Sequence, residues 1–330
     1  MTKIRWAMVG TGLMADLIVR DFALCDNTEL VAMITRDAKR AEPKFAEWGI
    51  APVRLIESYE AALADPDIDL IYVAAPHSEH HWMTKAPLEA GKHVLCEKAF
   101  MMDAAEARDV VELARAKGLF LMEALWTKFN PLMNDLQRRI AAGEIGQLKL
   151  VETHFGFNRP YDESHRLFDA KLGGGSTLDQ GIYTTSIIDW FAGGNLVSQY
   201  SRGELYPNGT DASAVTEFHY DNGVVGFGAS ALNATYGTTA RISGTDAYIE
   251  IDGPCWTPVS ATIYRYDSGD NLIAERIEVP KDGAGYSHMI REVSRAVIEG
   301  RTECHQRPLD ESIKIMGMLD EVRAQVRANA

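Results

Sequence analysis

The stretch Ile4-Arg5-Trp6-Ala7-Met8-Val9-Gly10-Thr11-Gly12-Leu13-Met14-Ala15 joins an apolar run, a Gly-x-Gly-x-x-Ala turn and the start of a helical pattern. Strand, glycine turn and helix in this order suit the pyrophosphate of a dinucleotide, because the helix N-terminus attracts the anion. Gly10 permits the tight turn, Gly12 lets the backbone approach the phosphates, and Ala15 lets the helix pack close to the strand. The predicted cofactor contacts here are Gly10, Thr11, Gly12, Leu13, Met14 and Ala15.

Apolar runs and helical patterns alternate between this turn and about residue 122. We expect strands at residues 30–34, 70–74, 93–96 and 119–122, with helical segments between them. The runs are continuously apolar, as parallel strands buried on both faces are. This succession predicts a parallel α/β sheet with right-handed crossovers, in which ligands bind beyond the carboxyl ends of the strands.

The residues after the second strand bear on the choice of dinucleotide. An acid there accepts hydrogen bonds from the ribose 2′-hydroxyl of NAD, whereas arginine pairs with the 2′-phosphate of NADP. This chain has Thr35 and Arg36 at that place, and Arg40 about one helical turn later. We expect NADP(H), although the neighbouring Asp37 leaves NAD open and the two arginines are also compatible with a solvated helix edge.

The next two strand ends supply further candidates. The third strand ends in small residues that let the nicotinamide half of a cofactor lie against the backbone, and the fourth ends in Glu97-Lys98. A lysine there can favour the ionised form of a nearby acid and donate to a substrate oxygen; an ordinary surface lysine is the alternative. The expected cofactor contacts are Ala75, Pro76, His77, His80, Glu97 and Lys98.

Three histidines, His77, His80 and His81, follow the third strand. His77 and His81 are four residues apart, but no cysteine lies near the three histidines, which argues against a zinc site. We therefore expect no metal ion, and instead a helix start with one histidine facing the cofactor.

Alternating apolar patterns mark the second half of the chain. A half-buried strand is expected at Leu148–Phe155, and Asp221-Asn222-Gly223 is a strong hairpin signal. Further alternating strands are expected at residues 214–220, 224–232, 238–243, 247–251 and 261–266. The pattern predicts a mainly antiparallel sheet with helices on one face.

A glycine-rich stretch within this half, residues 172–183, carries candidate catalytic groups. Its three glycines let the backbone pass close to a neighbour or turn freely. Ser176 and Asp179 have the spacing of a capping box. Asp179 and Tyr183 are four residues apart and so share a helix face, where a carboxylate and a phenol can form an acid/base pair. The alternative is a capping aspartate and a core tyrosine.

Composition limits the classes of partner. Lys plus Arg number 33 and Asp plus Glu 47, which gives a formal net charge of −14. This balance argues against nucleic acid and anionic membranes as partners. The four cysteines are widely spaced, the first predicted strand leaves no room for a signal peptide, and no apolar run reaches the length of a membrane span. We expect a cytoplasmic protein with reduced thiols.

These motifs together resemble the glucose–fructose oxidoreductase/inositol dehydrogenase (Gfo/Idh/MocA) family. Within it, the chain is similar to the branch of dimeric dihydrodiol dehydrogenases and NADP-dependent D-xylose dehydrogenases. The resemblance covers essentially the whole chain. It is carried by residues 10–15, Thr35-Arg36, residues 91–98, residues 122–129 and residues 173–183.

The resemblance implies a Rossmann domain at residues 1–123 and, at 124–330, an α/β domain with a large open, mainly antiparallel sheet through which homodimers form. The family's catalytic lysine corresponds to Lys98, and its second motif to Asp179 and Tyr183. Tyrosine at this last place matches the sugar and dihydrodiol branch. Trp126 falls in the motif at 122–129 and is expected near the cofactor.

Two positions depart from the family pattern. Ala99 replaces the proline after the lysine, so we expect a trans Lys98–Ala99 bond, because cis bonds before other residues are costly. Lys128 stands where many relatives have arginine, which trades a planar fork for a point charge.

The expected reaction moves a hydride between NADP(H) and a carbon of a sugar or trans-dihydrodiol. We expect Tyr183 to act as general acid/base, Lys98 to assist it, and Asp179 to orient the substrate or hold Lys98. The substrate face is expected to comprise His154, Phe155, Phe157, Arg159, Arg166, Asp179 and Tyr183. Two alternatives remain open: a non-catalytic NADP(H) sensor that acts on a transcriptional regulator, and a sugar oxidoreductase with permanently bound cofactor.

Overall fold

The computed structural model describes residues 2–329, which form two compact units. The first unit runs to Trp126 and includes Asp282–Met316, and the second comprises Thr127–Lys281 and the chain from Gly317 on. The predicted domains at 1–123 and 124–330 differ from these units. The chain leaves the first unit after Trp126, and a later segment returns to it.

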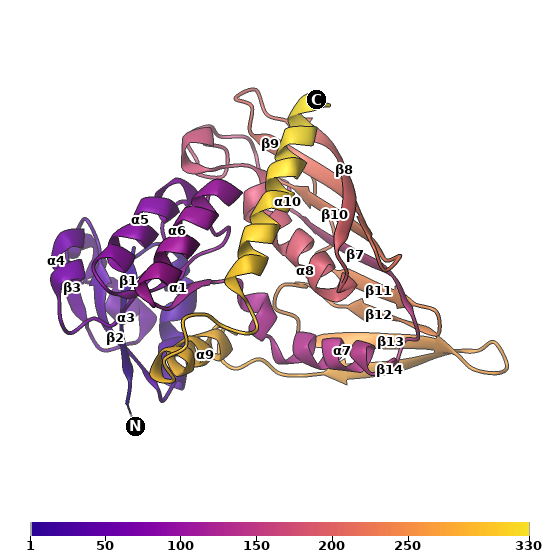
Figure 1. Ribbon diagram of the computed structural model, residues 1–330, viewed down its shortest axis with the longest axis horizontal. Helices are drawn as coiled ribbons and strands as arrows, with labels where there is room; N and C mark the ends of the chain where they lie inside the picture. The colour runs from indigo at the N-terminus through magenta and orange to yellow at the C-terminus, as the bar shows by residue number, and fades with distance from the viewer. Residues whose placement is uncertain (1, 330) are drawn as a thin grey trace. The chain divides into compact units, whose positions relative to one another are not determined.

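The first unit contains a six-stranded parallel sheet of order β3-β2-β1-β4-β5-β6, with helices connecting the strands (Figure 1). Its elements are β1 (Ile4–Val9), α1 (Leu13–Ile18), η1 (Val19–Leu24), β2 (Thr28–Ile34), α2 (Ala38–Ala41), α3 (Lys44–Trp48), β3 (Arg54–Ile56), α4 (Tyr59–Ala64), β4 (Leu70–Val73), α5 (His77–Glu89), β5 (His93–Cys96), α6 (Ala104–Lys117), β6 (Leu121–Glu123) and α9 (Ser287–Ile298). The predicted Rossmann-type sheet is confirmed, and the short edge strand β3 was missed.

Helix α9 returns to the first unit through buried polar bonds. The Trp6 indole in β1 donates to the Ser294 hydroxyl at 2.9 Å. The Asp21 carboxylate accepts from the backbone N–H groups of Tyr286, at 2.7 Å, and Ser287, at 3.1 Å. Because a buried carboxylate needs such donors, the segment from Asp282 completes the core of this unit.

The second unit contains an eight-stranded sheet of order β14-β13-β12-β11-β7-β10-β9-β8. Only the β7–β10 pair is parallel among its strand pairs, so the predicted mainly antiparallel sheet is confirmed. The elements are η2 (Trp126–Phe129, which begins at the last residue of the first unit), α7 (Pro131–Ala141), β7 (Leu148–Gly156), η3 (Ala170–Leu172), η4 (Thr177–Gly181), α8 (Ile182–Ala192), β8 (Leu196–Leu205), β9 (Asp211–Tyr220), β10 (Val225–Ala231), β11 (Ala240–Gly244), β12 (Ala247–Ile251), β13 (Ser260–Tyr266), β14 (Leu272–Glu278) and the second part of α10 (Leu309–Ala328).

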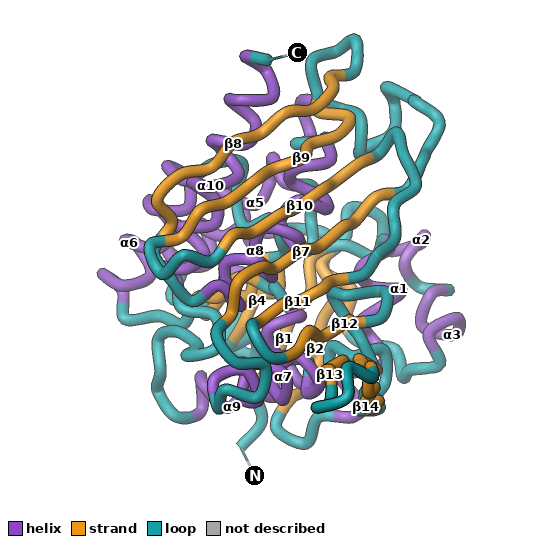
Figure 2. Tube along the Cα trace, turned by 90° about the vertical axis from the view of Figure 1, so that its right-hand side faces the viewer, coloured by secondary structure: helices purple, strands orange, loops and turns teal. Residues whose placement is uncertain are grey.

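One face of this sheet carries helices and the other is open. Figure 2 shows the strands in front, with α8 and α10 behind them. On the open face, which no helix of the described residues covers, Tyr200 is 63 % exposed, Val215 36 % and Phe227 39 %. The register places these side chains on one side of β8, β9 and β10. This is the face through which a dimer was predicted.

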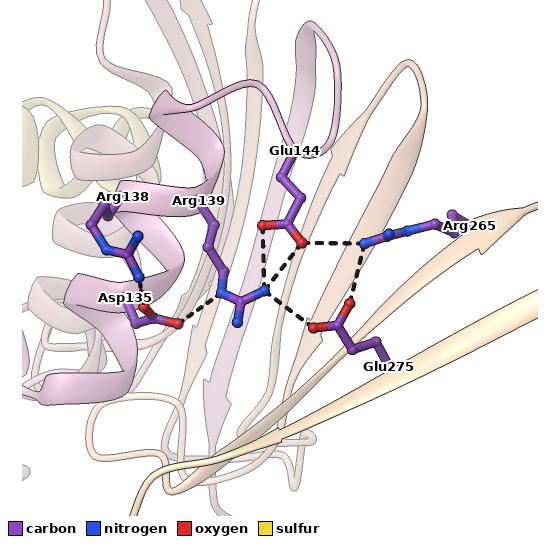
Figure 3. Close-up of polar contacts among 6 residues, drawn as sticks. All are labelled: Asp135, Arg138, Arg139, Glu144, Arg265 and Glu275. Carbon is purple, nitrogen blue, oxygen red and sulfur yellow. Dashed lines mark hydrogen bonds and ion pairs between the residues drawn. The ribbon is translucent and has the colours of Figure 1, made fainter.

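A network of ion pairs ties α7 to the far end of the sheet (Figure 3). The Arg139 guanidinium lies 2.8 Å from Asp135 one turn earlier, 3.1 Å from Glu144 and 3.2 Å from Glu275 in β14. Arg265 in β13 pairs with the same two glutamates at 3.3 and 3.4 Å. The network therefore connects a helix, a loop and the β13–β14 hairpin.

The four cysteines are buried and form no disulfide in the described chain. Among residues 2–329, none of the helices combines the length and the apolar run that a bilayer crossing requires.

Candidate active site

The glycine turn after β1 fits a dinucleotide pyrophosphate. Gly10 has φ +88°, and a Cβ at this position would lie 3.1 Å from the Ala74 carbonyl oxygen. A Cβ at Gly12 would meet nothing within 4 Å, so the space beside the turn is open. Gly12 also precedes α1 without a side chain that caps it, and Ala15 is fully buried. The backbone at Gly12 therefore leaves room for phosphates, and the contacts predicted for residues 10–15 stay a prediction.

Two arginines and an aspartate that caps a helix follow the end of β2. Arg36 and Arg40 are exposed. The Asp37 carboxylate caps α2 and accepts from the Arg40 N–H at 3.0 Å. Glu57, which the sequence did not suggest, accepts from the Ala38 N–H at 3.0 Å. Because Asp37 is engaged as a cap, it is less available to a ribose hydroxyl than the sequence alone implied.

Beyond β5, a buried carboxylate adjoins Lys98. Glu97 is 5 % exposed and accepts a short hydrogen bond from the Tyr72 hydroxyl. Burial raises the pKa of Glu97 to about 7. The Lys98 N–H donates to the other Glu97 oxygen at 3.2 Å, and the Lys98 side chain is half-buried. The Lys98–Ala99 bond is cis, so the expected trans bond was wrong.

His80 bridges the loops after β4 and β5. Its Nε2 lies 2.9 Å from the Ala75 carbonyl oxygen, and its Nδ1 lies 3.0 Å from that of Ala99 and 3.2 Å from that of Phe100. Burial lowers the pKa of His80. Both ring nitrogens face protein backbone, so a direct contact of His80 with a cofactor stays a prediction, as it does for the adjoining Ala75, Pro76 and His77.

Trp126 forms an aromatic stack that the sequence did not reveal. Its ring lies 3.9 Å from that of Tyr286, at an angle of 10°, and both side chains are buried. Nearby, the buried Glu123 accepts from the Phe100 N–H at 3.1 Å and pairs with the buried Arg307 at 2.5 Å. Tyr286 and Arg307 come from the returning segment, which no local signal places beside the first sheet.

In the second unit, backbone conformation accounts for Gly173 and close packing within the chain accounts for Gly174 and Gly175. Gly173 ends the η3 turn with φ +76°. A Cβ at Gly174 would lie 2.7 Å from the Leu167 carbonyl oxygen, and one at Gly175 would lie 2.3 Å from an Asp211 carboxylate oxygen. The close approach that the glycines permit is therefore to the protein itself.

Asp179 lies on a π-helical turn, η4. The capping box expected from Ser176 and Asp179 does not form, because the Ser176 hydroxyl donates to Asp211 at 2.9 Å. Asp179 pairs instead with Arg166 at 3.4 Å, and its side chain is 13 % exposed. Two predicted substrate-side residues thus lie in contact.

Tyr183, in the first turn of α8, is surrounded by aromatic rings. Phe155 lies 5.9 Å from it and Trp256 5.8 Å. Phe155 and Trp256 stack on each other at 3.8 Å, and Phe157 lies 6.2 Å from Phe155. The sequence missed Trp256, because its loop after β12 shows no local signal.

Of the other residues predicted on the substrate side, Arg159 lies beside His165 and His154 lies on the open face of the sheet. The Arg159 guanidinium lies 2.9 Å from a ring nitrogen of His165, and Arg159 is exposed. His154 alternates with Phe155 along β7, and its pairing with Ala229 places it on the open face. The expectation that His154 lines the same face as Phe155 was therefore wrong. Lys128 is buried over the Trp190 ring, 4.4 Å from its centroid.

The candidate residues thus fall into two groups. Lys98 and the predicted cofactor contacts belong to the first unit, and Asp179 and Tyr183 belong to the second. Within residues 2–329, no group of three or more His, Cys, Asp or Glu side chains is arranged to hold a metal ion.

Comparison with protein families gives matches over both parts of the chain. Residues 4–125 match an oxidoreductase family with an NAD-binding Rossmann fold, and residues 133–250 match the GFO/IDH/MocA C-terminal domain. Trans-1,2-dihydrobenzene-1,2-diol dehydrogenase of Bos taurus is 32% identical, covering 98% of this chain and 97% of the relative. D-xylose 1-dehydrogenase (NADP(+)) of Hypocrea jecorina is 29% identical, covering 98% and 92%.

Solved structures share the fold over the whole chain. An aldose–aldose oxidoreductase from Caulobacter crescentus superposes with a TM-score of 0.87 at 22% identity, covering 99% of this chain and 98% of the other. A 3-ketoreductase from Actinomadura kijaniata in complex with NADP and TDP-benzene gives 0.85 at 24% identity, covering 98% of both chains.

Proposed function

Because this chain belongs to the Gfo/Idh/MocA family of NAD(P)-dependent oxidoreductases, we propose that it is an NADP-dependent dehydrogenase of sugars or trans-dihydrodiols. The observation that carries the proposal is Tyr183, whose phenol lies in an aromatic wall on the same segment as the Asp179–Arg166 pair. A proton-transferring group beside a surface for a ring is what such a reaction requires.

In this mechanism Tyr183 removes the proton from the substrate hydroxyl and returns it in the reverse direction. The nicotinamide, when bound, supplies the hydride chemistry. Lys98 favours the ionised phenol, because a free tyrosine loses its proton only well above neutral pH. Asp179, held by Arg166, orients the substrate hydroxyl.

The aromatic rings bear on the class of substrate. The stacked pair of Phe155 and Trp256 offers a flat apolar surface beside Tyr183. Such a surface suits the apolar face of a sugar ring and the ring of a dihydrodiol alike. The names of the two relatives, a dihydrodiol dehydrogenase and a D-xylose dehydrogenase, support both substrates.

NADP is the proposed cofactor, held at Gly10 and Gly12 by its pyrophosphate and at Arg36 and Arg40 by its 2′-phosphate. The capping role of Asp37 supports this choice over NAD. We further propose a cytoplasmic homodimer that forms through the open face of the second sheet, and no nucleic-acid or membrane partner.

A steady-state assay at 340 nm tests the function, with NADP⁺ and NAD⁺ supplied in parallel to D-xylose, other aldoses and a trans-dihydrodiol. We expect turnover with NADP⁺ and a loss of at least about 100-fold in Y183F, because general acid/base groups contribute on this order. K98A is expected to lose turnover as well. Y206F is the matched control, since the Tyr206 hydroxyl is buried without a hydrogen-bond partner and its loss leaves turnover unchanged.

Other outcomes of this assay would support a different function. Tight NADP binding without turnover on any substrate would favour a cofactor sensor. Absorbance near 340 nm that copurifies with the protein would favour an oxidoreductase with permanently held cofactor. Normal turnover in Y183F or K98A would overturn the proposed mechanism.

A further inference from the structure

A buried carboxylate at the start of β9 organises the segment that carries the catalytic candidates. Asp211 is 5 % exposed. One of its oxygens accepts three hydrogen bonds from two consecutive residues: from the Ser176 hydroxyl at 2.9 Å, the Thr177 N–H at 2.5 Å and the Thr177 hydroxyl at 2.7 Å. Hydrogen bonds to an ionised acceptor are stronger than neutral ones, so this contact is a firm anchor.

The surrounding chain is shaped to hold this carboxylate. Gly175 has φ +116°, and any Cβ there would lie 2.3 Å from the second Asp211 oxygen. The Ser230 hydroxyl of β10 lies 3.2 Å from that of Ser176. The anchor therefore joins the glycine run to two neighbouring strands of the sheet.

The anchored residues lead directly into the candidate site. Thr177 is the first residue of the π-helical turn η4, which carries Asp179, and α8 follows at Ile182 and carries Tyr183. Single π-helical turns are rare and are frequently found at functional sites. The Ser176 side chain accepts no hydrogen bond from the backbone of this turn, and the Thr177 N–H at its start donates to Asp211 instead.

We infer that Asp211 is a positioning residue, which sets the place of Asp179 and Tyr183 by anchoring the start of the π-helical turn. It acts through Ser176 and Thr177. The inference rests on the proposed function, because it assigns Asp211 to the orientation of those two side chains. A misplacement on the order of 1 Å at reacting groups costs about 100-fold in rate, so a loosened turn lowers kcat.

A positioning role and a purely structural role predict different kinetics. If Asp211 only supports folding, its loss lowers the melting temperature and leaves kcat per folded molecule unchanged. If Asp211 positions the turn, kcat falls while the KM for NADP⁺ stays within about 2-fold, because the predicted cofactor contacts belong to the first unit.

The experiment compares D211N and D211A with D189N in the full chain. Asp189 is the matched control, a buried carboxylate of α8 that accepts from the Tyr220 hydroxyl at 3.2 Å. We expect kcat to fall about 10- to 100-fold in D211A, less in D211N, and to remain within about 2-fold of normal in D189N. Folding is checked by the melting temperature.

Two further variants test the inference if the Asp211 variants do not fold. T177V removes one donor with little change of volume, and G175A forces a methyl group against the carboxylate; both are expected to lower kcat with little change in the KM for NADP⁺. G175A and D211N are expected to combine non-additively, since both act on one contact.

Folded D211N and T177V with normal kcat would overturn the role of Asp211. The Y183F variant separates this outcome from failure of the proposed function. Normal turnover in Y183F refutes the function itself, whereas inactive Y183F beside fully active D211N refutes only the anchor.

Discussion

At the scale of single residues, Glu97 controls the charge beside Lys98. Its carboxylate is buried, accepts from Tyr72, and titrates with a pKa raised by burial to about 7, from an ordinary value of 4.5. Between these two values the folded protein holds a proton that the unfolded chain releases. The stabilisation from this group is thus complete below about pH 4.5 and is lost as the pH rises to about 7.

The variant E97Q should remove this pH dependence. Relative to E97Q, the wild type is expected to lose unfolding free energy between about pH 4.5 and 7, by at most about 1.4 kcal/mol per pH unit. Urea unfolding of both proteins across this range measures the difference. E112Q, which alters an exposed glutamate, serves as control and should follow the wild type. A constant difference between wild type and E97Q would contradict the raised pKa.

The arginines after β2 give a second prediction at this scale. R36A and R40A are each expected to raise the KM for NADP⁺ about 10-fold or more, because a hydrogen bond to a charged group contributes about 1.5–3 kcal/mol. The KM for NAD⁺ should change little, since NAD lacks the 2′-phosphate. Initial rates with NADP⁺ and with NAD⁺ give the two KM values for each variant. Equal effects on the two would show that neither arginine reads the phosphate.

Residue-scale predictability was uneven. Gly10, Gly12, Lys98 and Tyr183 stand in local motifs whose chemistry can be read from neighbours in the chain. Asp211 and Trp256 stand in no such motif. Their partners lie 34 and more residues away, and only the folded sheet brings them together.

At the scale of elements, periodicity predicted most helices and strands, and local chemistry changed their ends. The first helical segment after β2 is divided into α2 and α3, because Pro43 cannot continue the first helix. The turn at Asp221–Gly223 formed as predicted, with Tyr220 N–H donating to the Val224 carbonyl at 3.0 Å. The π-helical turn could not be predicted, since its geometry depends on an anchor from another strand.

The ion-pair network of α7 makes a prediction about element packing (Figure 3). R139A disconnects Asp135 from Glu144 and Glu275, which keep Arg265 as their shared cation, and is expected to lower the unfolding free energy by about 1 kcal/mol. R138A is the matched control: Arg138 neighbours it on the helix, is 73% exposed, and pairs only one turn back with Asp135, so its loss should cost less. Denaturant unfolding of both variants at low and high salt measures these losses. If R139A and R138A lose equal unfolding free energy, or if high salt does not reduce the loss in R139A, a cooperative network is contradicted.

At the scale of the whole molecule, the open sheet face carries the prediction of a dimer. F227E places a third carboxylate beside Glu152 and Glu217 on the face that exposes Tyr200 and Val215, and is expected to shift the protein from dimer to monomer. Light scattering after size exclusion measures the mass. L24E, at an exposed leucine of the first unit, should leave the assembly unchanged. A wild type that is monomeric at all concentrations would refute the dimer.

The return of Asp282–Met316 to the first unit has a consequence for dissecting the protein. A fragment cut near the predicted boundary would expose Trp6 and Asp21 without Ser294 and the N–H groups at residues 286 and 287. The first unit is thus one folding unit whose sequence comes from two separate segments of the chain. Only a fusion that splices both pieces together, and not a simple truncation, is expected to yield it in isolation.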